Sequence, residues 1–156
     1  MAKQVYQLTQ EGLDALNREL RDLKDVKREQ NKEALKEARA QGDLSENADY
    51  DAARNEQARI EARIAEIETI IKNAKIIKAT NDDIINIGKI VNVRFVDRDE
   101  KRVFHLISSI EADPSTGKVS IDSPIGKALK NHQKGDTVLV KSETGRTFQL
   151  EILDVK

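Results

Sequence analysis

Residues 50–74 read YDAARNEQARIEARIAEIETIIKNA, and one set of positions in this stretch recurs in alternating steps of three and four. The set is Tyr50, Ala53, Gln57, Ile60, Ile64, Ile67, Ile71 and Ala74. Alternating steps of three and four are the heptad period of a coiled coil. The stretch therefore predicts a long helix that packs along one side against another helix.

A second stretch, 13–41, has the same rhythm and contains neither glycine nor proline. Its seam begins with Leu13, Leu16, Leu20 and Leu23 and then weakens to Lys27, Gln30, Ala34 and Glu37, while Val26, Leu35 and Ala38 suggest a shift of register. Counterparts in the two seams, such as Leu13 with Ala74 or Glu37 with Tyr50, have residue numbers that sum to 87. A constant sum predicts an antiparallel hairpin over 10–76 that folds back between Asp43 and Leu44. An intermolecular coiled coil is the alternative; the hairpin reading predicts a monomer.

The second half of the chain is rich in turns. After residue 87 come five of the seven glycines and both prolines. Strands are predicted at 90–96, 102–107, 118–121, 137–140 and 146–155, with a short helix opened by Ser123 and Pro124. The fold class is therefore α+β, with a helical hairpin over 1–80 and a domain over 81–156 in which an antiparallel sheet carries one short helix.

Composition excludes several classes of protein. With 27 Lys and Arg against 28 Asp and Glu, the chain is no polybasic nucleic-acid binder. It has no cysteine, and therefore no disulfide, thiolate zinc site or cysteine nucleophile. It has neither a signal-peptide core nor an apolar run of membrane-spanning length, so we expect a cytoplasmic protein with no membrane partner. His105 and His132 show no catalytic or metal-ligand pattern, and no self-sufficient active site is predicted.

The predicted fold point carries a cluster of acidic residues, with four acids and no base between 43 and 51. Asp43 and Glu46 have capping-box spacing, and Asp49 and Asp51 would suit the positive end of a helix. Capping is thus one interpretation, and a functional carboxylate cluster at the end of the hairpin is the other. The flanking basic residues are either solvated helix faces with ion pairs or contacts to RNA or an acidic wall; they are Lys32, Lys36, Arg39, Arg54, Arg59 and Arg63.

The tip also carries a long sequence motif: Ala38-Arg39-x-x-Gly42-Asp43-Leu44-x-Glu46-Asn47-Ala48-x-Tyr50-x-Ala52-Ala53-Arg54. This motif resembles the tip of the bacterial Gre transcript cleavage factors, in their GreA-like form. Leu8-Thr9-x-Glu11-Gly12 and Ser123-Pro124-Ile125-Gly126-Lys127-Ala128-Leu129 extend the resemblance over essentially the whole chain. The resemblance implies that the second domain is FKBP-like.

The resemblance further implies a protein that binds bacterial RNA polymerase. The second domain would dock at the rim of the secondary channel, and the hairpin would reach the active centre. There Asp43 and Glu46 would help to hold a catalytic Mg²⁺ jointly with the polymerase, which would hydrolyse the RNA 3′ end of a backtracked complex. By position, Arg39, Arg54 and Asn47 would contact RNA or polymerase. The chain itself would be an accessory factor and not an enzyme.

Three other functions are weighed against this one. A related inhibitor that binds the same channel would share the hairpin and differ at the tip, where the Asp43 and Glu46 pair favours cleavage. A peptidyl-prolyl isomerase would need an aromatic pocket, and this domain offers only Phe95, Phe104 and Phe148. A purely structural coiled coil is the third. The family often has a proline where Glu29 stands, so its absence predicts a straighter first arm.

Overall fold

The computed structural model describes residues 4–41 and 47–156. The described chain divides into two compact units, a helical one formed by residues 4–5 and Glu11–Ala74 and a second one formed by Tyr6–Gln10 and Lys75–Lys156. We call them the hairpin unit and the sheet unit and describe each by itself.

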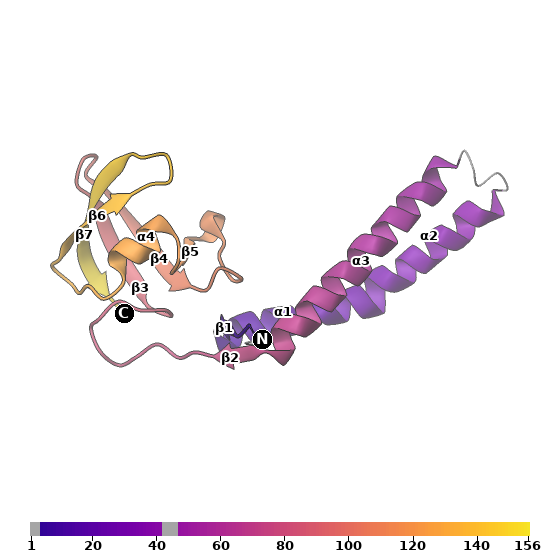
Figure 1. Cartoon of the computed structure of the whole chain (residues 1–156), viewed down its shortest axis with the longest axis horizontal. Coiled ribbons are helices and arrows are strands. Elements are labelled where there is room, and N and C mark those ends of the chain that lie inside the picture. Colours follow the sequence, from indigo (N-terminus) through magenta and orange to yellow (C-terminus); the bar gives the residue numbers. More distant parts are fainter. Residues whose placement is uncertain (1–3, 42–46) are drawn as a thin grey trace. The chain divides into compact units, whose positions relative to one another are not determined.

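The hairpin unit consists of two long antiparallel arms (Figure 1). The first arm contains α1 (Gln10–Asp22), a π-helical turn (Leu23–Lys27) and α2 (Arg28–Ala40), and the second arm is α3 (Ala48–Lys72). The predicted intramolecular hairpin is therefore confirmed. None of the helices in the described residues is both long and apolar enough to cross a membrane.

The seam between the arms follows the prediction only in part. Leu16, Ile60, Ile64 and Ile67 are buried as expected. In α2, however, the buried residues are Asn31, Leu35 and Ala38, whereas the predicted Gln30, Ala34 and Glu37 are exposed. Near the end of α3, Ile70 is buried and Ile71 only half-buried. The pairing with a constant sum of 87 is thus wrong for the tip half of the first arm.

The π-helical turn explains the difference. A π-helical turn contains one residue more than an α-helical turn, so every later position moves by one along the seam. Counting from Leu23, the predicted positions 27, 30, 34 and 37 become 28, 31, 35 and 38, which include the three residues that α2 buries. The first arm is accordingly not one continuous α-helix. The straighter arm expected from Glu29 stays a prediction.

Three ion pairs cross between the arms, one before this turn, one within it and one directly after it. Arg63 donates two hydrogen bonds to the carboxylate of Glu19, at 2.7 and 2.9 Å. Arg28 donates two to Glu61, at 2.8 and 2.9 Å, and the Lys24 ammonium lies 2.6 Å from a Glu68 oxygen. Because these pairs join the two arms, they support the register that the π-helical turn sets.

Two short strands flank the helices, β1 (Tyr6–Leu8) and β2 (Ala74–Ile76), and they pair as a two-stranded sheet. The sequence patterns did not predict them. Ile77 N–H donates to the Leu8 carbonyl oxygen at 2.8 Å, which continues the pairing beyond β2. Strands of three residues are too short to show an alternating pattern.

The sheet unit contains a five-stranded sheet of order β5-β4-β3-β7-β6. The strands are β3 (Ile90–Phe95), β4 (Glu100–Ile107), β5 (Lys118–Ser120), β6 (Thr137–Lys141) and β7 (Thr147–Val155). Three of the four pairings are antiparallel, as predicted, but β4 and β5 are parallel. The connection 108–117, which includes the 3₁₀ turn Pro114–Thr116, brings the chain back beside His105 before β5 begins, and this return makes the last pair parallel.

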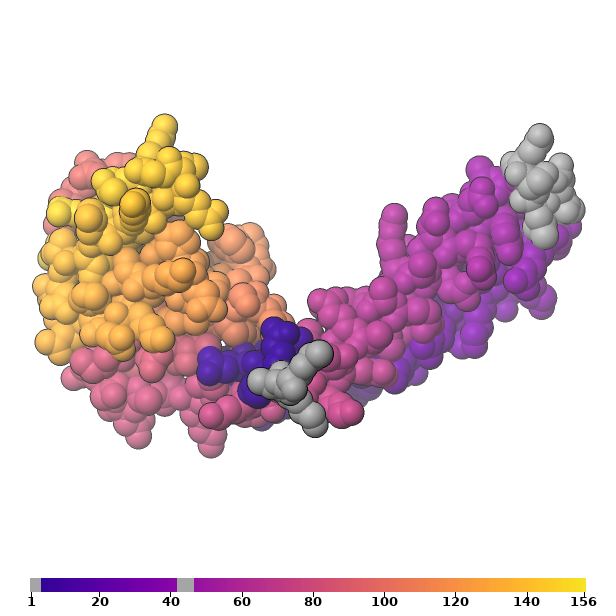
Figure 2. Space-filling model, viewed as in Figure 1, coloured from indigo at the N-terminus to yellow at the C-terminus, as the bar shows by residue number. Residues whose placement is uncertain are grey.

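One apolar core fills the sheet unit. Figure 2 shows part of the outer surface that encloses it, coloured from pink to yellow. It is built from alternate residues of the strands and from α4 (Pro124–Leu129), capped by Ser123 as predicted. A Cβ on Gly126 would lie 2.2 Å from the Ser120 carbonyl oxygen, so only glycine lets α4 approach β5 so closely.

Candidate functional site

The tip of the hairpin unit is framed by the end of α2 at Ala40 and the start of α3 at Ala48. The two predicted Mg²⁺ ligands, Asp43 and Glu46, lie outside the described residues. Within the described residues no group of three or more His, Cys, Asp or Glu side chains could hold a metal ion. The candidate site is therefore described through the residues next to the acidic pair in the sequence and on the two arms.

Asn47 borders the acidic pair and begins α3. Its Oδ1 accepts a hydrogen bond from the Tyr50 N–H at 3.1 Å, so Asn47 is the N-cap of this helix. Its Nδ2 donates to the Ala38 carbonyl oxygen at 2.7 Å, near the end of α2. The Asn47 side chain thus joins the two arms at the tip, and both ends of its amide are engaged.

The other two predicted contact residues, Arg39 and Arg54, are exposed on the two arms. Each follows a buried alanine of the seam, Ala38 or Ala53, so both flank the seam on the same side of the hairpin. The Arg39 guanidinium lies 6.0 Å from the centroid of the Tyr50 ring, and Arg54 Nη1 donates to Gln57 Oε1 at 3.2 Å.

The six basic residues predicted around the tip fall into two classes. Lys32, Arg59 and Arg63 are paired with Glu29, Glu56, and both Glu19 and Glu66, respectively. Lys36, Arg39 and Arg54 make no ion pair with any described residue. The ion-paired interpretation therefore holds for the first class, whereas the second retains charge for a partner. We call Arg39 and Arg54 the basic edge.

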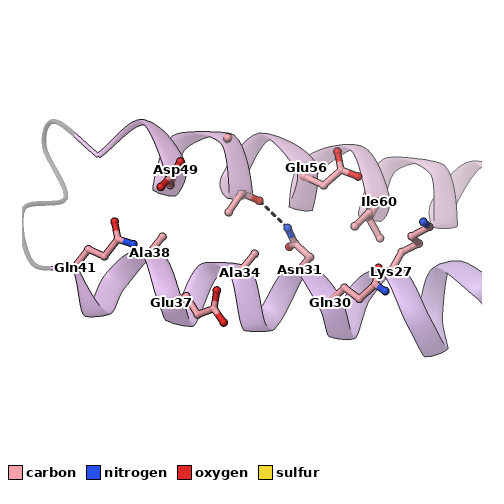
Figure 3. A pocket seen from close by; sticks show the side chains of 12 residues that line it. Lys27, Gln30, Asn31, Ala34, Glu37, Ala38, Gln41, Asp49, Glu56 and Ile60 are labelled. Carbon is pink, nitrogen blue, oxygen red and sulfur yellow. Dashed lines mark hydrogen bonds between the residues drawn. The ribbon is translucent and has the colours of Figure 1, made fainter.

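A groove of about 530 Å³ lies between α2 and α3 on the other side of the seam (Figure 3). Its lining includes residues that directly precede seam positions, such as Ala34 before Leu35. Arg39 and Arg54, which directly follow seam positions, do not line it. We call it the tip groove, and no motif in the sequence signalled it. It is lined by Lys27, Gln30, Asn31, Ala34, Glu37, Ala38, Gln41, Asp49, Ala52, Ala53, Glu56 and Ile60.

The sheet unit has a groove of similar size, about 540 Å³, which we call the phenylalanine groove. It brings together Phe95, Phe104 and Phe148, all the phenylalanines of the chain. The rings of Phe95 and Phe148 stack with centroids 5.5 Å apart, and the Arg98 guanidinium lies 4.7 Å from the Phe95 centroid. The sequence analysis named these three residues but did not predict that they line one groove.

Two family models match the chain. The model described as transcription elongation factor, N-terminal, matches residues 6–76, and the model described as transcription elongation factor, GreA/GreB, C-term, matches residues 79–156. The chain belongs to the GreA/GreB family. The resemblance inferred from the tip motif is thereby confirmed, and so is the α+β fold of hairpin and sheet.

Individual relatives match over nearly their full length. A protein of Acholeplasma laidlawii named Transcription elongation factor GreA is 60% identical over 153 residues, which cover 97% of this chain and 96% of that protein. One of the same name from Mesoplasma florum is 46% identical, with 99% of each chain covered. The crystal structure of GreA factor homolog 1 of Thermus thermophilus is 26% identical, covers 98% of this chain and 99% of that one, and has a TM-score of 0.45.

Proposed function

We propose that this chain is a transcription elongation factor that stimulates RNA polymerase to cleave the RNA 3′ end of backtracked complexes. Its membership of the GreA/GreB family supports the elongation role. The observation that carries the cleavage role is the tip itself. Asn47, which directly follows Glu46 in the sequence, joins the two arms through its side chain. Asp43 and Glu46 belong to the segment between the two arms in the sequence, and we propose that they act at this end.

The donor chemistry of Asp43 and Glu46 fits Mg²⁺. This ion usually takes one or two protein carboxylates and completes its coordination with water and substrate phosphate. Bound jointly with the polymerase, it would supply an activated water and charge stabilisation for phosphodiester hydrolysis. The two carboxylates of this chain would bind and position, and the polymerase would contribute the catalytic centre. The chain would thus act as an accessory factor.

The basic edge would hold the RNA. Arg39 and Arg54 flank the same side of the seam and form no ion pair with the described residues, so their charges are available to phosphate. A chain of net charge −1 gains little from general attraction to nucleic acid, and two local arginines give such contact only at the tip.

The phenylalanine groove would dock the sheet unit on the polymerase. Phenylalanine and arginine are enriched at the cores of protein interfaces, and this groove provides Phe95, Phe104 and Phe148 next to Arg98. The two units would then have separate tasks, with binding in the sheet unit and stimulation of cleavage at the hairpin tip.

The test is a double variant, Asp43→Ala with Glu46→Ala, added to a purified backtracked polymerase complex with labelled RNA. We expect loss of the shortened transcript while binding to polymerase persists. Because the N-cap of α3 is Asn47, circular dichroism of the variant should match the parent. Cleavage at the parent rate would refute the metal role. If the parent binds but only slows transcription, the chain is instead the channel-binding inhibitor.

A further inference from the structure

The tip groove is distinct from the three surfaces that the proposed function uses. It lies on the side of the seam opposite the basic edge, and Figure 3 shows side chains of both α2 and α3 around it. We infer that the tip groove receives a basic protein segment, a lysine- or arginine-bearing stretch of the polymerase. The inference takes the identity of the partner, the polymerase, from the proposed function. It takes the basic character of the bound segment from the residues that line the groove.

The first observation is the shape of the groove. The tip half of the hairpin has small side chains in and beside its seam, and Ala34, Ala38 and Ala52 leave space that larger residues would fill. The resulting volume of about 530 Å³ is enough for one or two long side chains or one face of a helix.

The second observation is the charge of the groove. Glu37, Asp49 and Glu56 line it, and Lys27, at the end of the π-helical turn, is the one basic residue among the described residues of the lining. Glu37 and Asp49 make no ion pair with any described residue, so their charge is not neutralised within the hairpin unit. Such a surface repels phosphate and attracts a cationic side chain, which favours protein over RNA as the occupant.

The third observation is a free acceptor in the groove. Asn31 is only 7% exposed, and its Nδ2 donates a hydrogen bond to the Ala53 carbonyl oxygen at 2.9 Å. Its Oδ1 accepts no hydrogen bond from any described residue, and Asn31 belongs to the lining of the groove. An occupant with an N–H donor, as lysine and arginine have, would satisfy this acceptor.

The two flanks of the tip would therefore divide the work. The basic edge would face RNA, and the tip groove would face a protein wall, which would fix the rotation of the hairpin about its own axis. This rotation matters because the Asp43 and Glu46 carboxylates can serve the polymerase centre only if they are presented in one orientation.

The experiment compares matched variants of the full chain in binding to bacterial core RNA polymerase, with a fluorescent label on the parent and competition by each variant. Glu37→Lys reverses a groove charge, and Glu33→Lys makes the same charge change on an exposed position outside the groove. Ala34→Gln fills the groove, and Ala58→Gln adds the same atoms at an exposed position outside it. Circular dichroism verifies that all four fold.

We expect Glu37→Lys and Ala34→Gln to weaken binding about tenfold and the two controls to change it less than twofold. A photo-crosslinker at position 34 should label a polymerase subunit, whereas one at position 54 should label RNA. Equal binding by groove and control variants, or RNA labelled from position 34, would overturn this inference and leave the proposed function standing. A parent protein that does not bind polymerase would overturn both.

Discussion

Asn47 shows how much one side chain contributes to the tip. Its amide accepts from the Tyr50 N–H and donates to the Ala38 carbonyl oxygen, so it both starts α3 and ties it to α2. The sequence offered a capping box at Asp43 and Glu46, but α3 starts one residue after Asn47. Asparagine is as good an N-cap as aspartate, but the capping interpretation rested on the spacing of Asp43 and Glu46 and did not consider Asn47.

We predict that Asn47→Ala lowers the free energy of unfolding by about 1 kcal/mol, because the first turn of α3 loses its cap. Asn47→Asp keeps the acceptor and removes the donor to Ala38, so it should retain most of the stability. Urea titration followed by circular dichroism measures both. An alanine variant as stable as the parent would show that this cap does not support the hairpin.

For the candidate contact residues too, the sequence predicted which residues matter but not all of their partners. Sequence motif and position singled out Arg39 and Arg54, and the structure shows that they flank the same side of the seam and form no ion pair with described residues. It could not be read from the sequence that Arg63 binds Glu19, because these residues are 44 positions apart and meet only once the register is fixed.

At the scale of elements, the heptad pattern predicted both arms and their antiparallel direction. The constant-sum pairing failed in α2 because a π-helical turn has no sequence signature of its own. The shift of register suggested by Val26, Leu35 and Ala38 is correct for Leu35 and Ala38, which are buried, but not for Val26, which is exposed. The parallel pairing of β4 and β5 was missed for a related reason. Strand patterns predict the strands themselves, whereas the path of the 108–117 connection decides which way β5 runs.

The π-helical turn provides a direct test of the register. Deleting the exposed Asp25 removes the extra residue, and Leu35 and Ala38 then continue the heptads of α1 in one α-helix. We expect this variant to remain folded and to melt within a few degrees of the parent in circular dichroism. Deleting the exposed Asn55 from the regular α3 is the control, because it turns later residues by about 100° and should destabilise the hairpin strongly. Similar losses in both would contradict the account.

The ion pairs between the arms predict a dependence on pH. The hydrogen bonds from Arg63 hold the pKa of Glu19 below its ordinary value of 4.5. The stabilisation is therefore complete above about pH 4.5 and is lost as pH falls through the lowered pKa. Because the pair is partly exposed, we expect it to contribute about 0.5 kcal/mol to the free energy of unfolding.

Urea titrations at several pH values check this expectation. Glu19→Gln should lose part of the acid destabilisation, whereas Glu33→Gln, which removes a carboxylate with no ion pair among described residues, should retain it. Identical pH profiles for the parent and Glu19→Gln would show that the pair contributes nothing.

At the scale of the whole molecule, the sequence predicted a helical hairpin followed by a sheet domain, and both are present. Glycine and proline distribution was sufficient for this division, because breakers are excluded from long helices. The grooves of the two units were not predictable, since each depends on side chains from segments far apart in sequence. That the protein is a monomer, and that it works in the cytoplasm, remain predictions.

The most direct test of the central claim uses 5′-labelled RNA in three mixtures with Mg²⁺: backtracked polymerase alone, the chain alone with free RNA, and the two together. We predict rapid shortening of the transcript only when polymerase and chain are combined, and a shortened RNA that polymerase can extend again. The chain alone should cut nothing, because two carboxylates leave most of the coordination of Mg²⁺ to water and substrate phosphate, and the acidic pair needs the polymerase to complete the site. An uncleaved transcript in the combined mixture, or specific cutting by the chain without polymerase, would contradict the account.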